Sequence, residues 1–350
     1  MADTTTTPKP RLNLPGRGAR KLVEAGGALV REERLTPGGE LPLVVRPASA
    51  DVDLADWARH NAAHVEQRLA THGAVLFRDF AVTAPVHFEQ FASALCPDLF
   101  NENGEHPRRT VSGKVYTPVF YPPDKQLLWH NENSFNHQWP TRIWFGCLRP
   151  ADAGGETPLA DSRRVYEMID PAVRREFEAR GVMYVRNYGT GLGLDWQTVF
   201  RTDDPAEVER RCHTAGMACE WKSGGRLKTS CVRPAAVTHP RTGERVWFNQ
   251  AQHWHVACLA AEDRAALTAS FAPEDLPRHC YFGDGGIIED SVMDDILAVY
   301  QELEVVFPWQ RGDIVMVDNL LTAHGRNRFE GAREMLVAMG AMMTYGEVTC

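Results

Sequence analysis

The sequence predicts an α+β fold that is mainly a β core, of the barrel or sandwich kind, with helices packed outside it. From residue 116 onward the chain consists of short β-rich runs broken by Gly and Pro, a texture typical of many-stranded cores. Before residue 116, helical patterns alternate with short apolar runs. Nothing resembles a Ser/Gly linker, so we expect one domain over residues 41–350, after a disordered or irregular lead over residues 1–40.

The first part is expected to begin with a strand over residues 41–45 and a helix over residues 52–71. The helix is indicated by apolar residues at helical spacing, namely Leu54, Trp57, Ala58, Val65 and Leu69. Asp51 stands where an N-cap belongs, and Gly73 where a left-handed residue ends a helix. This one-sided helix is predicted to lie on a sheet.

A buried strand over residues 74–77 follows, and then a second helix that begins at Thr83 and Pro85. Its apolar face consists of Phe88, Phe91, Ala92 and Leu95. In the β-rich part, strands are expected over residues 116–120, 126–132, 143–148, 156–160, 182–187, 246–249, 313–317 and 334–343. Helical insertions are expected over residues 163–169, 171–180, 205–216 and 290–304, and they should pack outside the β core.

Composition excludes several classes of protein. The chain has 350 residues, of which 43% are hydrophobic, and a net charge of -8, which argues against binding to nucleic acid. No run approaches the roughly 18 apolar residues of a membrane span, and the Thr- and Pro-rich N-terminus lacks the apolar core of a signal peptide. The eight scattered cysteines form no Cys-X-X-Cys pair, so we expect free thiols, most of them buried, and a cytoplasmic location.

His130 and Glu132 are candidate metal ligands. They stand two residues apart in a predicted strand, so their side chains point to the same side. An imidazole and a carboxylate are two of the three ligands of the facial triad that binds Fe(II) in non-haem oxygenases. The triplet also arises by chance at solvated strand ends. His324 follows a strand and a short turn late in the chain, and it supplies the third ligand if an antiparallel core brings the distant segments together.

Arg333 opens the last predicted strand, where it shares one face with Met335, Val337 and Met339. An arginine on this apolar face would point into the core. A buried guanidinium needs a carboxylate, and its planar fork matches one through two hydrogen bonds. We therefore expect Arg333 to bind an anion inside the β core.

Four motifs together resemble the taurine dioxygenase/TfdA family of Fe(II)- and 2-oxoglutarate-dependent oxygenases. The resemblance covers residues 43–340 and is greatest to the branch with syringomycin-type aspartyl hydroxylases and clavaminate-synthase-like enzymes. The motifs are Trp129-His130-Asn131-Glu132, the run from Ala153-Gly154-Gly155-Glu156-Thr157-Pro158 to Asp161, Val246-Trp247-Phe248-Asn249-Gln250, and Ala323-His324-Gly325-Arg326 followed by Gly331-Ala332-Arg333. The resemblance implies a double-stranded β-helix, or jelly roll, with flanking helices.

The resemblance also implies roles for individual residues. The iron ligands correspond to His130, Glu132 and His324. Thr157 corresponds to a hydroxyl donor to 2-oxoglutarate, and Arg333 to the arginine that binds its distal carboxylate. The interval from His324 to Arg333 is short for the family, which leaves Arg326 and Arg328 as alternatives.

The implied reaction uses Fe(II), 2-oxoglutarate and O2 to hydroxylate an unactivated C–H bond. The expected substrate is small and amino-acid-like, free or tethered to a carrier protein, in natural-product biosynthesis. Desaturation and cyclisation are alternatives, whereas Glu132 argues against halogenation, because the related halogenases have a small residue there. A zinc-dependent hydrolase would leave Arg333 and Thr157 without a role, and a silent binding protein would not need the triad. The oligomeric state stays open.

Other patterns receive simpler interpretations. His253-Trp254-His255 lacks a nearby carboxylate, so packed histidines are favoured over a metal site. The glycines of residues 189–193 lack the lysine of a P-loop and are expected to form a flexible loop near the site. Residues 222–228 are expected to form a solvated basic turn, with one of its basic side chains meeting an anionic substrate or a partner as the alternative. Candidates for lining the substrate pocket are Asn131, Asn133, Ser134, Phe135, Arg186 and Tyr188.

Overall fold

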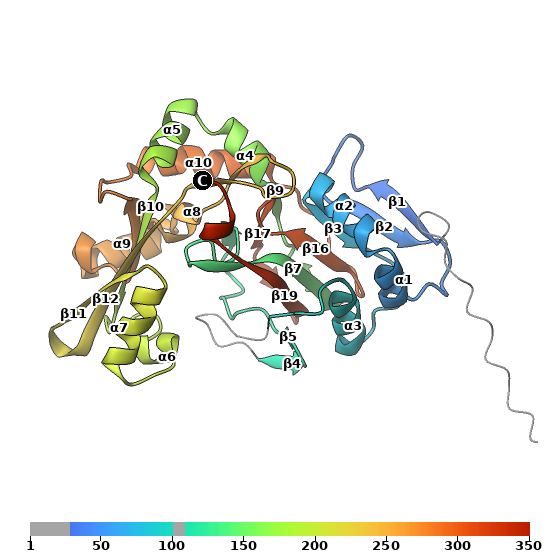
Figure 1. Ribbon diagram of the computed structural model, residues 1–350, viewed down its shortest axis with the longest axis horizontal. Coiled ribbons are helices and arrows are strands. Elements are labelled where there is room, and N and C mark those ends of the chain that lie inside the picture. The colour runs from blue at the N-terminus through green and yellow to red at the C-terminus, as the bar shows by residue number, and fades with distance from the viewer. Residues whose placement is uncertain (1–28, 101–108) are drawn as a thin grey trace, which may run out of the picture.

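The computed structural model describes residues 29–100 and 109–350 (Figure 1). The expectation for residues 1–28 of the lead therefore lies outside the described residues. Within the rest of the lead, Val30–Arg34 forms strand β1, which pairs antiparallel with β2 (Leu43–Pro47). Four of its five residues are exposed, because an edge strand is held by backbone hydrogen bonds and tolerates charged side chains. An irregular structure was thus the wrong expectation for these five residues.

Helices and strands are interspersed along the described chain. The helices are α1 (Leu54–His60), α2 (Ala62–His72), α3 (Pro85–Leu95), α4 (Ser162–Met168), α5 (Pro171–Arg180), α6 (Trp196–Phe200), α7 (Pro205–Thr214), α8 (Ala251–Trp254), α9 (Ala261–Ser270) and α10 (Asp290–Leu303). The remaining strands are β3 (Ala74–Phe77), β4 (Thr110–Ser112), β5 (Val115–Tyr116), β6 (Leu127–His130), β7 (Gln138–Arg149), β8 (Ala153–Gly154), β9 (Leu159–Asp161), β10 (Val182–Tyr188), β11 (Ala218–Lys222), β12 (Arg226–Arg233), β13 (Ala236–Thr238), β14 (Arg245–Trp247), β15 (Arg278–Phe282), β16 (Ile314–Asp318), β17 (Thr322–Arg326), β18 (Phe329–Glu330) and β19 (Glu334–Thr344). Among these described helices, none is long and apolar enough to cross a membrane.

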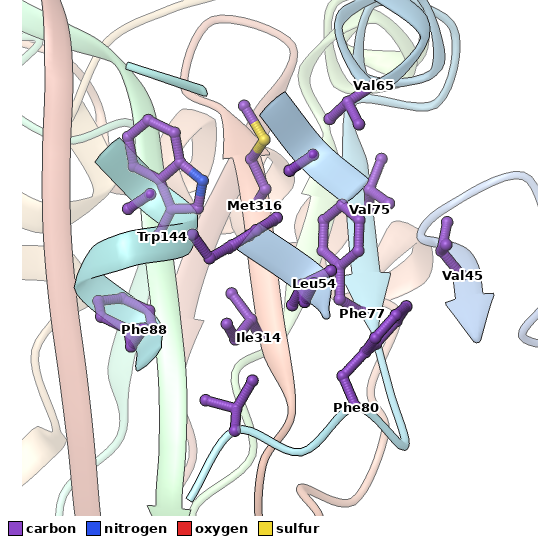
Figure 2. Packing of buried hydrophobic residues seen from close by; sticks show 14 of the residues in the cluster. Val45, Leu54, Val65, Val75, Phe77, Phe80, Phe88, Trp144, Ile314 and Met316 are labelled. Carbon is purple, nitrogen blue, oxygen red and sulfur yellow. The ribbon is translucent and has the colours of Figure 1, made fainter. Parts of the chain in front are cut away.

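The largest sheet has eight strands in the order β1-β2-β3-β16-β7-β19-β5-β4. Helices α1, α2 and α3 cover its outer face (Figure 1). Between helices and sheet lies a hydrophobic core in which Leu54 and Phe88 from the helices meet Phe77, Trp144 and Met316 from the strands (Figure 2). Burial of these large side chains is the main force that fixes the helices on the sheet.

The predicted helix over residues 52–71 is two helices. Asn61 lies between α1 and α2 with φ -121° and ψ 21°, and its side-chain amide donates to the carbonyl oxygen of Trp57 at 2.8 Å. The first cap is Asp53, whose side chain accepts from the amide of Asp56, so Asp51 was the wrong prediction. Gly73 does end the second helix, with φ 75°. Both short helices bury their apolar residues in the same core against the sheet.

A three-stranded sheet in the order β6-β17-β9 faces the inner side of the large sheet. The two sheets approach closely, since the rings of Phe145 in β7 and His324 in β17 lie 5.0 Å apart. This pair of opposed sheets, antiparallel except for the parallel pair β2 and β3, has helices outside and confirms the α+β fold with a jelly-roll core. A further sheet, β11-β12-β10-β15, packs with α5, α8 and α10 beside the jelly roll and forms the lobe at the left of Figure 1.

Strand boundaries differ from prediction where pairing partners decide them. The expected strand over residues 116–120 is reduced to β5, which ends at Tyr116, whereas the strand expected over residues 143–148 extends to twelve residues in β7. Strand β7 is long because both its edges are paired, with β16 and with β19. The eight cysteines all lie in the described part and are free, as expected.

Candidate active site

A cavity of about 280 Å³ lies between the large and the three-stranded sheet. Its walls come from β7 and β19 on one side, β6 and β17 on the other, and β10, β15 and α8 at one end. The residues that line it are Pro118, Val119, Phe120, Tyr121, Leu127, His130, Glu132, Asn133, Phe135, Ile143, Phe145, Thr157, Arg186, Gln250, His253, Trp254, Arg278, His324, Gly325, Arg326, Arg333, Met335, Val337 and Met339. The three predicted metal ligands are among them.

His130, Glu132 and His324 meet at one wall of this cavity. One ligand atom from each lies within 4.8 Å of the other two, the geometry of a metal site. The Nε2 atoms of His130 and His324 lie 3.6 and 3.9 Å from Oε2 of Glu132. Among the described residues, this is the single group of three such side chains that is able to hold a metal ion. Two imidazoles and one carboxylate fit the facial triad of Fe(II).

A backbone contact determines which atom His130 presents. Nδ1 of His130 lies 2.9 Å from the carbonyl oxygen of Leu128, so this nitrogen carries the proton and Nε2 keeps its lone pair for the metal. His324 is the register partner of His130 on the neighbouring strand. Opposite residues of an antiparallel pair share one face, which places the two imidazoles together. Their rings lie 4.5 Å apart.

Glu132 does not lie in a strand, contrary to the prediction of a strand over residues 126–132. Strand β6 ends at His130, and Glu132 stands in a turn whose next residue, Asn133, has φ 60°. The side chain of Asn319 replaces the missing strand partner: its Oδ1 accepts from the Glu132 amide at 2.7 Å, and its Nδ2 donates to the Glu132 carbonyl oxygen at 2.9 Å. Asn319 is fully buried. It was not predicted from the sequence.

Two glutamines next to the strand end were also missed. Nε2 of Gln250 donates to the carbonyl oxygen of Asn131 at 2.6 Å, and Nε2 of Gln252 donates to that of Trp129 at 2.7 Å. The carbonyl groups on both sides of His130 are therefore held by Gln250, which precedes α8, and by Gln252 within α8. The motif that ends at Gln250 was a signal for this role, but no local pattern shows which carbonyl groups the amides reach.

Arg333 lies inside the cavity, as predicted, on the face that carries Met335, Val337 and Met339. Its Nε donates to the carbonyl oxygen of Gly155 at 3.0 Å. A side chain at position 155, where φ is 76°, would place its Cβ 3.1 Å from that Nε, so a glycine is needed there. Burial, together with the charge of Arg326, lowers the pKa of Arg333 to about 10, which still leaves the guanidinium charged at neutral pH.

The two alternative arginines are placed differently. Arg326 donates from both terminal nitrogens to backbone carbonyl oxygens, among them those of Tyr121 and Pro122 at 3.0 and 2.8 Å. Arg328 is exposed and does not line the cavity. Thr157 is buried on the cavity wall, and its Oγ1 accepts from Nε1 of Trp309 at 3.3 Å. Among these three arginines, Arg333 has the position suited to an anionic co-substrate.

The remaining candidates divide into two groups. Asn133, Phe135 and Arg186 line the cavity, whereas Asn131, Ser134 and Tyr188 are buried in the supporting structure. His253 also lines the cavity, with its ring 5.2 Å from that of His130, so it belongs to the site and is not a histidine packed beside the core. His255 is buried away from the cavity. In the predicted basic turn, Lys222 is paired with Asp275 at 2.8 Å.

The fold and the site together define a class of enzyme. Residues 34–339 match the model of the taurine catabolism dioxygenase TauD, TfdA family, and the chain belongs to this family of oxygenases. Its enzymes use Fe(II), 2-oxoglutarate and O2, and the three converging side chains, with Arg333 and Thr157 nearby, fit that requirement.

Two proteins and one solved structure are similar to the chain over most of its length. The chain is 37% identical to the dapdiamide synthesis protein DdaC of Enterobacter agglomerans, over 87% of this chain and 92% of that protein. It is 30% identical to a clavaminate synthase-like protein of Arabidopsis thaliana, over 85% of this chain and 93% of that protein. The structure of AAD-2 in complex with Mn(II) and N-oxalylglycine has the same fold, with a TM-score of 0.51 and 18% identity over 90% of this chain and 98% of that one.

Proposed function

We propose that this dioxygenase hydroxylates a C–H bond of a small, amino-acid-like substrate in natural-product biosynthesis. His130, Glu132 and His324 would bind Fe(II), and Arg333 and Thr157 would bind 2-oxoglutarate. The observation that carries the proposal is the convergence of three ligand atoms within 4.8 Å on the wall of a cavity that also contains Arg333. The substrate class is supported by similarity to a dapdiamide synthesis protein. Residues 41–350 would act as one domain.

In the proposed reaction, the protein positions the reactants and binds them through charged side chains. Bound Fe(II), with O2 and 2-oxoglutarate, supplies the oxidation of the C–H bond. The two imidazoles of His130 and His324 and the carboxylate of Glu132 would hold the ion, and a facial triad of this kind would leave further positions for the reactants. The guanidinium of Arg333 holds the distal carboxylate of 2-oxoglutarate, and the apolar side chains of β7 and β19 exclude water from the co-substrate. Asn319 and Gln250 hold the ligand strand in place.

The proposal also includes the cellular location of the protein, the form of its substrate and the type of oxidation. The free cysteines fit a reducing compartment such as the cytoplasm. A carrier protein that presents the substrate is the alternative to a free substrate. Hydroxylation is favoured over halogenation, because Glu132 occupies the ligand position where a chloride would bind. Desaturation or cyclisation by the same site would be recognised from the mass of the product.

An anaerobic titration tests the proposal. Fe(II) and 2-oxoglutarate added to the protein without O2 should produce the weak visible charge-transfer band of the chelate. When O2 is then admitted in the presence of a panel of free and carrier-bound amino acids, a product 16 mass units heavier than its substrate should form. A zinc hydrolase would show no such band and would turn over without 2-oxoglutarate. A protein without the band and without an oxidised product would be a silent relative, and the proposal would fail.

A further inference from the structure

Thr157 on the cavity wall has a hydrogen bond that fixes the direction of its hydroxyl group. Nε1 of Trp309 lies 3.3 Å from Oγ1 of Thr157, and both residues are buried, Trp309 with 7% and Thr157 with 3% of its surface exposed. An indole nitrogen only donates, so the hydroxyl oxygen is the acceptor. The hydroxyl proton itself makes no hydrogen bond within residues 29–100 and 109–350. It is therefore left for an acceptor in the cavity.

Trp309 is held behind this wall by a buried ion pair. It belongs to the loop that precedes β16 and does not line the cavity. Arg78 donates to both carboxylate oxygens of Asp313, at 3.0 and 2.6 Å, and to the carbonyl oxygen of Pro308 at 2.9 Å. The ring of Phe307 packs against the indole, with 5.4 Å between ring centroids. These contacts hold the loop on both sides of Trp309 and so fix the direction of its N–H group.

The two residues assigned to the co-substrate both present donors. Nε of Arg333 donates at 3.0 Å to the carbonyl oxygen of Gly155, two residues before Thr157, so the guanidinium and the hydroxyl lie at the same end of the cavity. A guanidinium has no acceptor, and with Trp309 in place the Thr157 hydroxyl also offers its proton. A ligand group that binds both must accept from both. The two oxygens of a carboxylate do so, whereas the nitrogen of a primary amide does not.

We propose that Trp309 is a positioning residue that makes Thr157 act only as a donor and thereby selects a free carboxylate in the co-substrate. The inference rests on the proposed function, in which Arg333 and Thr157 bind the distal carboxylate of 2-oxoglutarate, and it adds the residue that sets the polarity of that contact. Without the indole N–H, the hydroxyl is able to rotate and to accept from an amide as well as donate to a carboxylate. Loss of Trp309 should therefore weaken binding of the acid and narrow its advantage over the amide.

Two substitutions separate the N–H group of Trp309 from its bulk. Trp309→His keeps the five-membered ring, with Nε2 in place of the indole nitrogen, but leaves part of the volume empty. Trp309→Phe fills more of the volume and lacks the donor. Calorimetric titration of 2-oxoglutarate into the full chain, loaded anaerobically with Mn(II), should give an affinity about threefold to tenfold below the parent value for Trp309→Phe and a higher affinity for Trp309→His. The reverse order would show that the ring acts by packing, and the inference would fail.

A double-mutant cycle tests whether Trp309 acts through Thr157. Thr157→Ala should weaken binding of 2-oxoglutarate by about tenfold to a hundredfold, as for loss of a hydrogen bond to a charged group. Addition of Trp309→Phe to Thr157→Ala should weaken binding no further, because the hydroxyl that the indole orients is already absent. Effects that multiply in the double variant would contradict the inference.

Discrimination between an acid and its amide gives a second readout. The probes are N-oxalylglycine, an isostere of 2-oxoglutarate, and the same compound with its glycine carboxylate converted to a primary amide. The parent should bind the acid at least tenfold more tightly than the amide, and this ratio should fall by about threefold in Trp309→Phe. It should stay above one, because Arg333 keeps its charge. A ratio that is the same in both proteins would overturn the inference.

Trp196 provides a matched control outside the cavity. It is also 7% exposed, and its Nε1 donates to the carbonyl oxygen of Gly225 at 3.1 Å. Trp196→Phe should leave the affinity for 2-oxoglutarate unchanged. A loss equal to that in Trp309→Phe would show a general effect of stability and would refute the role of Trp309. Trp309→Leu, which also lacks the donor, replaces Trp309→Phe if that variant does not fold.

Failure of this inference differs from failure of the proposed function. If Thr157→Ala weakens binding of 2-oxoglutarate and Trp309→Phe does not, the assignment of Trp309 is wrong and the proposed function stands. If Thr157→Ala binds 2-oxoglutarate like the parent, the role of Thr157 is wrong in both proposals. A parent protein that binds neither Mn(II) nor 2-oxoglutarate would contradict both proposals as a whole.

Discussion

In the proposed site, the imidazoles of His130 and His324 and the carboxylate of Glu132 would act as one unit, because each would supply one of three bonds to the same ion. We expect His324→Ala to abolish Fe(II)-dependent turnover and to remove the visible band of the 2-oxoglutarate chelate, while the circular dichroism spectrum stays that of the parent. His130→Ala and Glu132→Ala should do the same. Full activity in purified His324→Ala would show that the metal ligands are other residues.

Arg333 lies in the cavity, and Arg328 at the surface is a natural control for it. Removal of one partner from a buried charge-assisted pair costs about 2 to 5 kcal/mol, so Arg333→Ala should weaken binding of 2-oxoglutarate by more than tenfold. Arg328→Ala should leave it unchanged. The measurement is titration of 2-oxoglutarate into the Mn(II)-loaded protein. An affinity for Arg333→Ala within a few-fold of the parent value would make Arg326 the better candidate.

At the scale of elements, the site depends on the turn between β16 and β17. Asp318 is buried there, where Arg142 donates to it at 2.8 Å and its Oδ1 accepts from the amides of Leu320 and Leu321. Burial alone would raise the pKa of Asp318, but Arg142 and His239 lower it below its usual value. This ionised residue fixes the turn, and the turn places Asn319 beside Glu132.

The contact between Asn319 and Glu132 gives a prediction at that scale. Asn319→Ala leaves the Glu132 amide and the carbonyl oxygens of Glu132 and Pro140 without these bonds, so it should weaken metal binding by about tenfold to a hundredfold. The measurement is competitive titration of the metal against a chelator. Asn187→Ala is the matched control: it also removes a buried amide that holds two carbonyl groups, but away from the triad. It should reduce stability by about 1 to 3 kcal/mol and leave metal affinity unchanged.

At the scale of the whole molecule, a buried histidine pair makes stability depend on pH. Burial, and then the neighbouring His255, lowers the pKa of His279 to about 4 from its ordinary value of 6.5, with Asp290 acting in the opposite direction. Between these values the unfolded chain binds a proton that the folded chain does not, so stability falls as pH decreases through this window.

We therefore expect His279 to reduce the free energy of unfolding by about 2 kcal/mol when pH falls from 7 to 5. Urea denaturation of the parent and of His279→Asn at both pH values measures the effect. Asparagine is chosen because the Nδ1 atom of His279 accepts from the amide of Val256, and an amide oxygen is able to accept as well. Equal pH dependence in the two proteins would show that His279 is not responsible.

The sequence by itself predicted the residues to which the proposed function assigns the chemistry. His130, His324 and Arg333 were recognisable because ligand type, strand alternation and the surrounding motifs are local properties of the chain. Helices α3 and α5 were predicted for the same reason, since Pro85 and Pro171 mark their starts and their apolar spacing is complete within each segment.

Only the tertiary structure decided how those residues are held and what else faces the cavity. The turn position of Glu132, its bonds to Asn319 and the opposition of Arg186 and Arg278 all arise between segments far apart in the chain. Each depends on the register in which strands pair, and a shift of one residue would turn these side chains to the other face. A local pattern contains the chemistry of a side chain but not the identity of its partner, because the partner is fixed by packing of the whole β core.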